Sequence, residues 1–409
     1  MAPEPGLVAL ARATRACTIS ELDAVNGDRS AVLVHPRGRL LRISGSAALL
    51  VQAVHAGDTP DVIAARCGAS VEALDRAAHD LAARIASAFH SPSDERIPGF
   101  LAHRMLFSSE RTTRWASRMT WMFDRRVGPV LALAAIAIVI AARSADADAQ
   151  LSPFALWAGF GLSVVVMFVH ELGHAAACRA FGAPVGPIGC AIYLVYPALY
   201  CDVTHTWSLP RRARLVVDLG GVYLQMIGTA VVAVLWWATG APVLLAATRI
   251  SVAMMAMNLL PIGRFDGYWV LSDVLGIINL RAQQRRLVIA AWSRLSGRQV
   301  APLPWSWWVS LMIGAYGIVS VWFVSTIALR FLPHVLAELW CLPERLVAAA
   351  NAERVADAAA SLGRVASSII IAVIAALLVR NLARSAVALI REAVRHVRQA
   401  SSPPAPRSD

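Results

Sequence analysis

Residues 168–182 read FVHELGHAAACRAFG, a largely apolar stretch in which a glutamate lies between two histidines. His170 and His174 are one helical turn apart, so both imidazoles can face a single metal ion. Glu171 lies beside them and can act as a general base toward water. Three such side chains cost several kcal/mol in a lipid-spanning helix, which favours a catalytic role over a chance match to a short pattern. The stretch predicts a zinc-dependent hydrolytic site inside a membrane-spanning helix.

The composition of the chain agrees with a membrane location. Of its 409 residues 57% are hydrophobic, and the mean hydropathy is +0.58. Charged residues make up 16%, against about a quarter in soluble proteins. The net charge of +12 could suit nucleic acid, but in a membrane protein the placement of charge matters more than its total. The six cysteines show no C-x-x-C spacing, which argues against a disulfide framework and against a thiolate zinc site.

Apolar runs predict a mainly α-helical, polytopic membrane protein with about six transmembrane helices. A span needs roughly 20 apolar residues, so the first run is the shortest candidate. The runs are 128–142, 154–178, 214–238, 242–262, 306–332 and 366–383. Arginine is concentrated before the first, third and fifth runs and after the sixth, which predicts that both termini are cytoplasmic. The apolar segment 183–200, interrupted by Gly and Pro, is expected to be a re-entrant or membrane-surface piece.

A catalytic zinc site keeps three protein ligands and one open position, so a third ligand must be sought. No glutamate occurs between Glu171 and Glu338, which leaves aspartates. The nearby ones are Asp202, Asp218, Asp266 and Asp273. The stretch MNLLPIGRFDGYWVLSD (257–273) favours Asp266, because Pro261 removes a backbone donor and Gly267 loosens the helix. A carboxylate can be turned inward there.

The two motifs together resemble the site-2 protease family of intramembrane zinc metalloproteases. H-E-x-x-H lies in one span, and N-x-x-P-x-x-x-x-D-G begins at Asn258 near the end of a later one. The resemblance implies that His170, His174 and Asp266 bind Zn²⁺ and that Glu171 is the catalytic base. It also implies that Asn258 lies near the substrate backbone.

The chain departs from the family between these motifs. DLGGVYLQM (218–226) stands where the family has a Gly-Pro pair, so Asp218 is either a partner of a ligand or a buried charge. Asp202 and Asp273 are further candidate partners of the ligands. The strings YCDVTHTWSLPRRAR (200–214) and FDGYWVLSDVLGIINLR (265–281) resemble a branch of peptide zinc metalloproteases often found with peptide-maturation genes.

The first 92 residues predict a small α+β domain of winged-helix-like form. Residues 31–44 suggest a β-hairpin with Leu33 and Leu41 toward the core, followed by helices at 45–55, 59–68 and 70–86. Nine arginines balance nine acidic residues, which argues against nucleic acid. The apolar pattern from Val32 onward resembles the PqqD-like domains of peptide-modifying enzymes. That resemblance implies capture of a leader peptide by strand addition, and a purely structural cap is the alternative.

These features divide the chain into four parts: a recognition domain (1–92), a linker and interfacial segment (93–126), a membrane metalloprotease domain (127–388) and a cytoplasmic tail (389–409). We expect an endopeptidase of the bacterial cytoplasmic membrane that removes the leader from a ribosomally made, modified precursor peptide. Daptide-type clusters are one candidate setting, with peptide-modifying enzymes and membrane lipid as further partners. Two alternatives stay open. One is regulated cleavage of an anti-sigma factor or signal-peptide remnant. The other is non-enzymatic export or immunity, which the intact Glu171 disfavours.

Overall fold

The computed structural model describes most of residues 5–350. The gaps are 23–29, 35–39, 91–99, 146–149, 194–195, 262, 264, 278–279, 298–302 and 304, and beyond 350 only Val365, Ser368 and Arg380 are described. The expected sixth span (366–383) and the tail (389–409) therefore lie outside the described residues, apart from two positions in the span.

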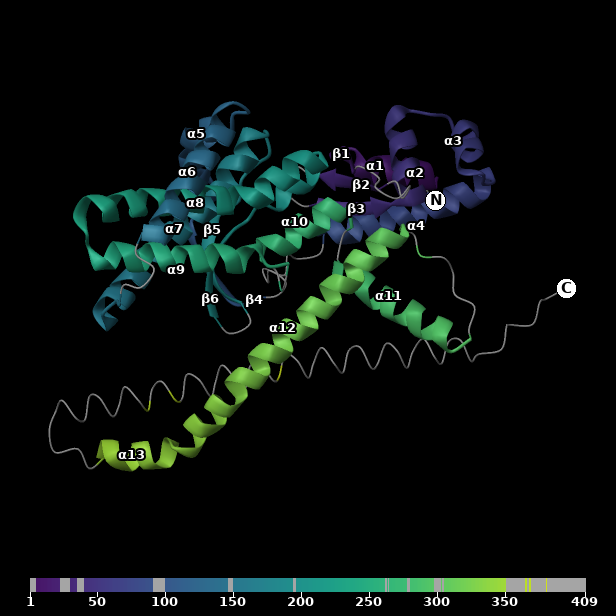
Figure 1. Ribbon diagram of the computed structural model, residues 1–409. Coiled ribbons are helices and arrows are strands. Elements are labelled where there is room, and N and C mark those ends of the chain that lie inside the picture. Colours follow the sequence, from purple (N-terminus) through teal and green to yellow (C-terminus); the bar gives the residue numbers. More distant parts are fainter. Residues whose placement is uncertain are drawn as a thin grey trace.

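The N-terminal part combines a three-stranded antiparallel sheet with four helices (Figure 1). The elements in chain order are α1 (Gly6–Thr14), β1 (Thr18–Leu22), β2 (Ser30–Val34), β3 (Leu40–Ser44), α2 (Gly45–Ala56), α3 (Pro60–Cys67) and α4 (Val71–His90). Leu33 pairs with Leu41 across β2 and β3, and both pack in the core. The hairpin, its inward leucines and the three following helices agree with the sequence prediction, whereas α1 and β1 were not foreseen.

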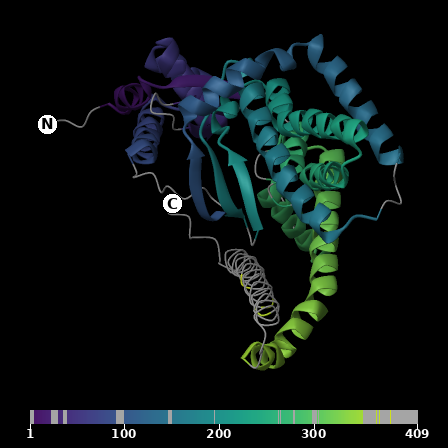
Figure 2. The same cartoon turned by 90° about the vertical axis from the view of Figure 1, so that its left-hand side faces the viewer.

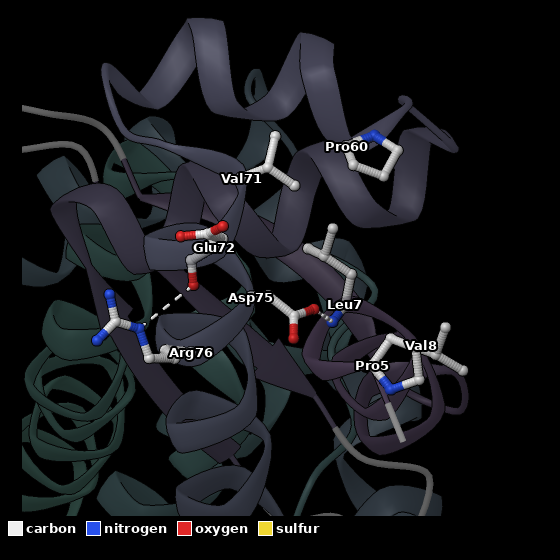
Figure 3. Close-up of a pocket in the computed structure, with 8 residues that line it drawn as sticks. All are labelled: Pro5, Leu7, Val8, Pro60, Val71, Glu72, Asp75 and Arg76. Atoms are coloured by element: carbon white, nitrogen blue, oxygen red, sulfur yellow. Dashed lines mark hydrogen bonds between the residues drawn. The ribbon is translucent and has the colours of Figure 1, made fainter. Parts of the chain in front are cut away.

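Helix α1 packs across α4, where Gly6 allows a close approach. A Cβ at Gly6 would collide with the backbone carbonyl of Asp75, and the Leu7 N–H donates to the Asp75 carboxylate at 3.3 Å. A hollow of about 510 Å³ lies beside this contact (Figure 3). Its lining is Pro5, Leu7, Val8, Pro60, Val71, Glu72, Asp75 and Arg76. Aliphatic and charged side chains both line the hollow. Its Val8 and Val71 side chains are exposed.

Four described helices are long and apolar enough to cross a membrane, which indicates a membrane protein. They are α6 (Val127–Ala145), α7 (Pro153–Ala180), α8 (Arg211–Thr239) and α9 (Pro242–Leu259). Ser152 caps α7 by accepting from the Ala155 N–H, and Gly240 ends α8 with a φ of 67°. The expected span 306–332 lies in α12 (Trp307–Trp340). Within α12, the apolar segment Trp307–Phe323 is shorter than these four helices.

A second antiparallel sheet lies beside α7 and has the order β4–β5–β6 (Figure 2). Its strands are β4 (Phe100–Phe107), β5 (Ile188–Tyr193) and β6 (Tyr196–Cys201). The segment 183–200, expected as a re-entrant or surface piece, thus contributes a hairpin, and the linker contributes a strand. Phe107, Trp115 and Phe168 form an aromatic cluster that fixes β4 and α5 (Ser109–Met119) against α7.

Helices α7 and α8 cross at very short distance because glycines face each other. A Cβ at Gly173 would collide with the backbone carbonyl of Gly220, so neither position admits a side chain without a shift of the backbone. The crossing lies beside the histidine pair of α7.

The remaining elements are η1 (Thr120–Phe123), η2 (Thr204–Ser208), α10 (Asp266–Leu275), α11 (Leu280–Leu295) and α13 (Leu342–Ala350).

Candidate metal centre

Three side chains from two helices meet at one point. His170 Nε2 lies 2.9 Å from an Asp266 carboxylate oxygen, and His174 Nε2 lies 3.4 Å from the other oxygen. The two Nε2 atoms are 3.1 Å apart. One ligating atom from each residue lies within 4.8 Å of the others, a spacing that could hold a metal ion.

Local backbone geometry brings the aspartate to the histidines. His170 and His174 share a face of α7, and α10 begins at Asp266 after a turn that contains Gly263 with a φ of 66°. A Cβ at Gly267 would collide with the Leu259 carbonyl, so glycine lets α10 fold closely against the end of α9. This turn is the Pro–Gly context from which the sequence analysis expected an inward carboxylate.

Hydrogen bonds at the far side of each ring leave both Nε2 atoms as electron-pair donors. His170 Nδ1 lies 2.9 Å from Gln225 Oε1, and His174 Nδ1 lies 2.8 Å from the Val217 carbonyl oxygen. Both partners accept, so each Nδ1 carries a proton, and in the neutral imidazole each Nε2 then holds the lone pair that a metal ion needs.

The resulting donor set fits zinc. Asp266 Oδ2 is buried and receives no hydrogen bond from the described part of the chain, although it lies against His170 Nε2. With both imidazoles neutral, two lone-pair nitrogens converge on a carboxylate oxygen, an arrangement that a cation stabilises. Two imidazoles and one carboxylate form a ligand set that Zn²⁺ takes in hydrolases, with the fourth position left open.

Glu171 lies beside the three converging groups and is 5% exposed. Its carboxylate lies near the backbone N–H of Cys201, the last residue of β6. The Asp202 N–H donates to the Pro187 carbonyl within the hairpin at 3.0 Å, so the preceding N–H points to the opposite side of the strand. The end of β6 thus lies beside the carboxylate that the sequence predicts as the base.

The Cys201 thiol is a poor candidate for a further ligand. Its sulfur is not among the converging ligating atoms, which in the described part of the chain come from His170, His174 and Asp266. This agrees with a site built from imidazole and carboxylate.

Helix α8 lies directly against the two histidines. A Cβ at Gly221 would collide with Nε2 of both His170 and His174, so only glycine leaves this space open. Gln225, one turn further along α8, contacts His170 as described above. Sequence reasoning missed both residues. The signals were present in DLGGVYLQM, which has paired glycines and a glutamine within an otherwise apolar span.

The remaining predicted site residues take different places. Asn258 is half-buried and lies 3.8 Å from the Met167 sulfur, one turn before His170. The Asp202 carboxylate accepts from the backbone N–H and the hydroxyl of Thr204, the first residue of η2, at 3.0 and 2.5 Å. The carboxyl of Asp218 lies against that of Asp273 and close to His174.

Asp273 forms a buried ion pair rather than a contact with the histidines. Its oxygens accept from Arg214 Nε and Nη2 at 2.9–3.1 Å, and both side chains are buried. The Arg214 guanidinium also lies 5.5 Å from the centre of the Trp207 ring. This pair links α10, which begins with Asp266, to α8, which carries Gly221.

Comparison with known proteins gives a distant relative. The chain is 26% identical over 121 residues to "Putative peptide zinc metalloprotease protein YydH" of Bacillus subtilis (strain 168). The match covers 28% of this chain and 48% of the relative, so it spans about half of the relative's length. No family model and no solved structure matches the chain. The likeness supports a distant relationship to a protein named as a zinc-dependent protease.

Proposed function

We propose that this chain is a zinc-dependent endopeptidase that acts within the membrane. The observation that carries the proposal is the convergence of His170, His174 and Asp266 beside Glu171, in a helix long and apolar enough to span a bilayer. Ionisable side chains within a bilayer cost free energy, so they are rarely present there without a function. The base is needed for hydrolysis and not for binding alone, so Glu171 supports an enzyme rather than an exporter or immunity protein.

The proposed reaction is hydrolysis of a peptide bond. Zinc held by His170, His174 and Asp266 would polarise the scissile carbonyl and make water more acidic. Glu171 takes a proton from the attacking water as the new C–O bond forms. It then gives that proton to the leaving amine as the C–N bond breaks. The Cys201 N–H lies near this carboxylate. Asn258 contacts Met167, one helical turn before His170, and would hold the substrate backbone from there.

The geometry of β6 suits an extended substrate. β6 is at the edge of its sheet, and its outward N–H groups alternate with those that pair with β5. An extended peptide beside this edge would gain main-chain hydrogen bonds and place its backbone next to Glu171. A peptide bond presented in this way is accessible to the base without unwinding of α7.

The depth of the site follows from the helix length. His170 is 17 residues after Pro153, which is about 26 Å at 1.5 Å per residue, within an apolar core of roughly 30 Å. The zinc would then lie a few ångström below one membrane face. The arginine-rich connections favour the cytoplasmic face, with both termini on that side, in a bacterial cytoplasmic membrane.

We further propose that the substrate is a precursor peptide whose leader binds the N-terminal domain. This domain presents β3 at a sheet edge, and its β1 and β2 contact η2, which follows β6 in the chain. A leader held by this domain would be tethered to the part of the chain that carries Glu171. The PqqD-like pattern of residues 32–85 supports leader capture, and removal of the leader is the cleavage expected of such an enzyme.

The proposal is tested with the purified full-length chain in lipid nanodiscs. Quenched fluorescent peptides of extended sequence are offered with and without a chelator, and zinc is then added back. We expect cleavage that stops on chelation and returns with Zn²⁺. Cleavage that persists in the absence of metal would contradict a zinc mechanism.

A further inference from the structure

We propose that Gln225 is a positioning residue of the zinc site, which holds His170 with its Nε2 turned toward the metal. The inference rests on the proposed zinc site and assigns a role to a residue that lies outside the two sequence motifs. Gln225 lies on α8 and is completely buried. A glutamine in that position must have its amide satisfied within the protein.

The orientation of the Gln225 amide is fixed by α9. The amide nitrogen donates to the Ser251 carbonyl oxygen at 3.3 Å. A backbone carbonyl can only accept, so the NH₂ group faces α9 and the amide oxygen faces His170. The oxygen in turn accepts from His170 Nδ1 at 2.9 Å. One side chain therefore links α7, α8 and α9 and determines the ring nitrogen that carries the proton.

A neutral partner suits the charge of this buried site. Two neutral imidazoles, the carboxylates of Asp266 and Glu171, and a Zn²⁺ ion sum to zero. The partner of His174 is the Val217 carbonyl, which is also uncharged. Histidine ligands often donate to a carboxylate, but here a carboxylate would leave an extra buried negative charge. Glutamine supplies the acceptor without that charge.

Three substitutions test the role. Gln225→Leu removes the acceptor at nearly constant volume, and Gln225→Asn retracts the amide oxygen from His170 by one methylene. Loss of such a partner weakens metal affinity by about 10–100-fold, and we expect that for both variants. Gln225→Glu keeps an acceptor at the same reach, and its second oxygen faces the Ser251 carbonyl, where it must carry a proton. The side chain therefore stays uncharged, and zinc affinity should stay within about fivefold of the wild type, well short of that loss.

The matched control is Thr229→Val. Thr229 is also completely buried on α8, one turn further on, and its hydroxyl donates only to the Gln225 backbone carbonyl in the described contacts. This variant removes a buried polar group without touching the Gln225 amide. We expect this variant to bind zinc with wild-type affinity. If loss of a buried polar group on α8 were enough to weaken zinc binding, the control would lose affinity too.

Zinc affinity is measured by chelator competition on the full-length protein, without reference to activity. The visible spectrum of the Co²⁺-loaded protein gives a second readout, which should change in Gln225→Leu and Gln225→Asn and stay near wild type in Gln225→Glu. Wild-type affinity in both Leu and Asn variants would overturn the proposal. So would a Glu variant as weak as they are. A wild-type chain that binds no zinc would instead overturn the proposed function.

Discussion

The site depends on which atom of each side chain faces the common point. His170 and His174 each use Nδ1 to donate to a neutral acceptor, which leaves Nε2 available. Asp266 presents a buried oxygen to the same point. By contrast, the oxygens of Asp202 and Asp273 are occupied by Thr204 and Arg214. This difference distinguishes the proposed ligand from the other aspartates nearby.

Asp266→Ala is therefore expected to lower zinc affinity by more than about 100-fold, because even the loss of an outer partner costs 10–100-fold. Asp202→Ala should keep most of the zinc and is the matched control. Asp273→Ala is a poor control, since it leaves the buried Arg214 uncompensated at a cost of about 3–5 kcal/mol. Metal analysis of the purified variants decides the matter. Zinc loss in Asp202→Ala with retention in Asp266→Ala would refute the assignment.

Sequence spacing predicted that His170, Glu171 and His174 lie together, and the Pro–Gly context singled out Asp266. Those positions depend on local helix and turn geometry, which a sequence encodes directly. Their roles at a zinc ion stay predictions. Gln225 could not be placed in advance, because its partner lies 55 residues away on another helix. A polar residue within an apolar span can be recognised from the sequence as unusual. The sequence does not reveal which residue it contacts.

The crossing of α7 and α8 is the element-level feature on which the site depends. Facing glycines bring the helices together, and Gly221 leaves space for both imidazoles. The four membrane helices were predictable to within a few residues because hydropathy is a local property. The β4–β5–β6 sheet was not, since β4 pairs with β5, which lies more than 80 residues later, and β5 and β6 are as apolar as a span.

Gly221→Ala is expected to reduce zinc affinity and cleavage by at least about tenfold, since the added methyl group displaces both ligands from their common point. Gly228→Ala is the control on the same helix, because a Cβ there meets Val166 at an ordinary 3.4 Å. Chelator competition and peptide cleavage are compared for the two variants. If both lose zinc to the same degree, the close approach at Gly221 is not specific to the metal centre.

At the scale of the whole molecule, the N-terminal domain is connected to the β4–β5–β6 part of the chain in two ways. In sequence, β4 is the first strand after α4, and in space β1 and β2 contact η2, which follows β6. The sequence predicted a separate domain followed by a linker. It did not predict that the linker supplies a strand to the sheet beside α7.

Deletion of residues 1–90 is expected to slow the processing of a leader-bearing precursor by about 10-fold to 100-fold at low substrate, because tethering raises the local concentration of the scissile bond. A short peptide that contains only the cleavage site should be cut equally by both forms. Processing rates for the two substrates are compared, with zinc content as a check on folding. Equal slowing of both substrates would mean a structural cap, and slowing of neither would end the leader-recognition proposal.

The most direct test of the account is to measure bound zinc and peptide cleavage on one purified sample of Glu171→Gln. The amide is nearly the same size as the carboxylate but cannot take a proton from water. The account predicts zinc content equal to the wild type and a fall in cleavage rate of at least about 100-fold, the contribution of a general base. Near-normal turnover by this variant would contradict the proposed mechanism.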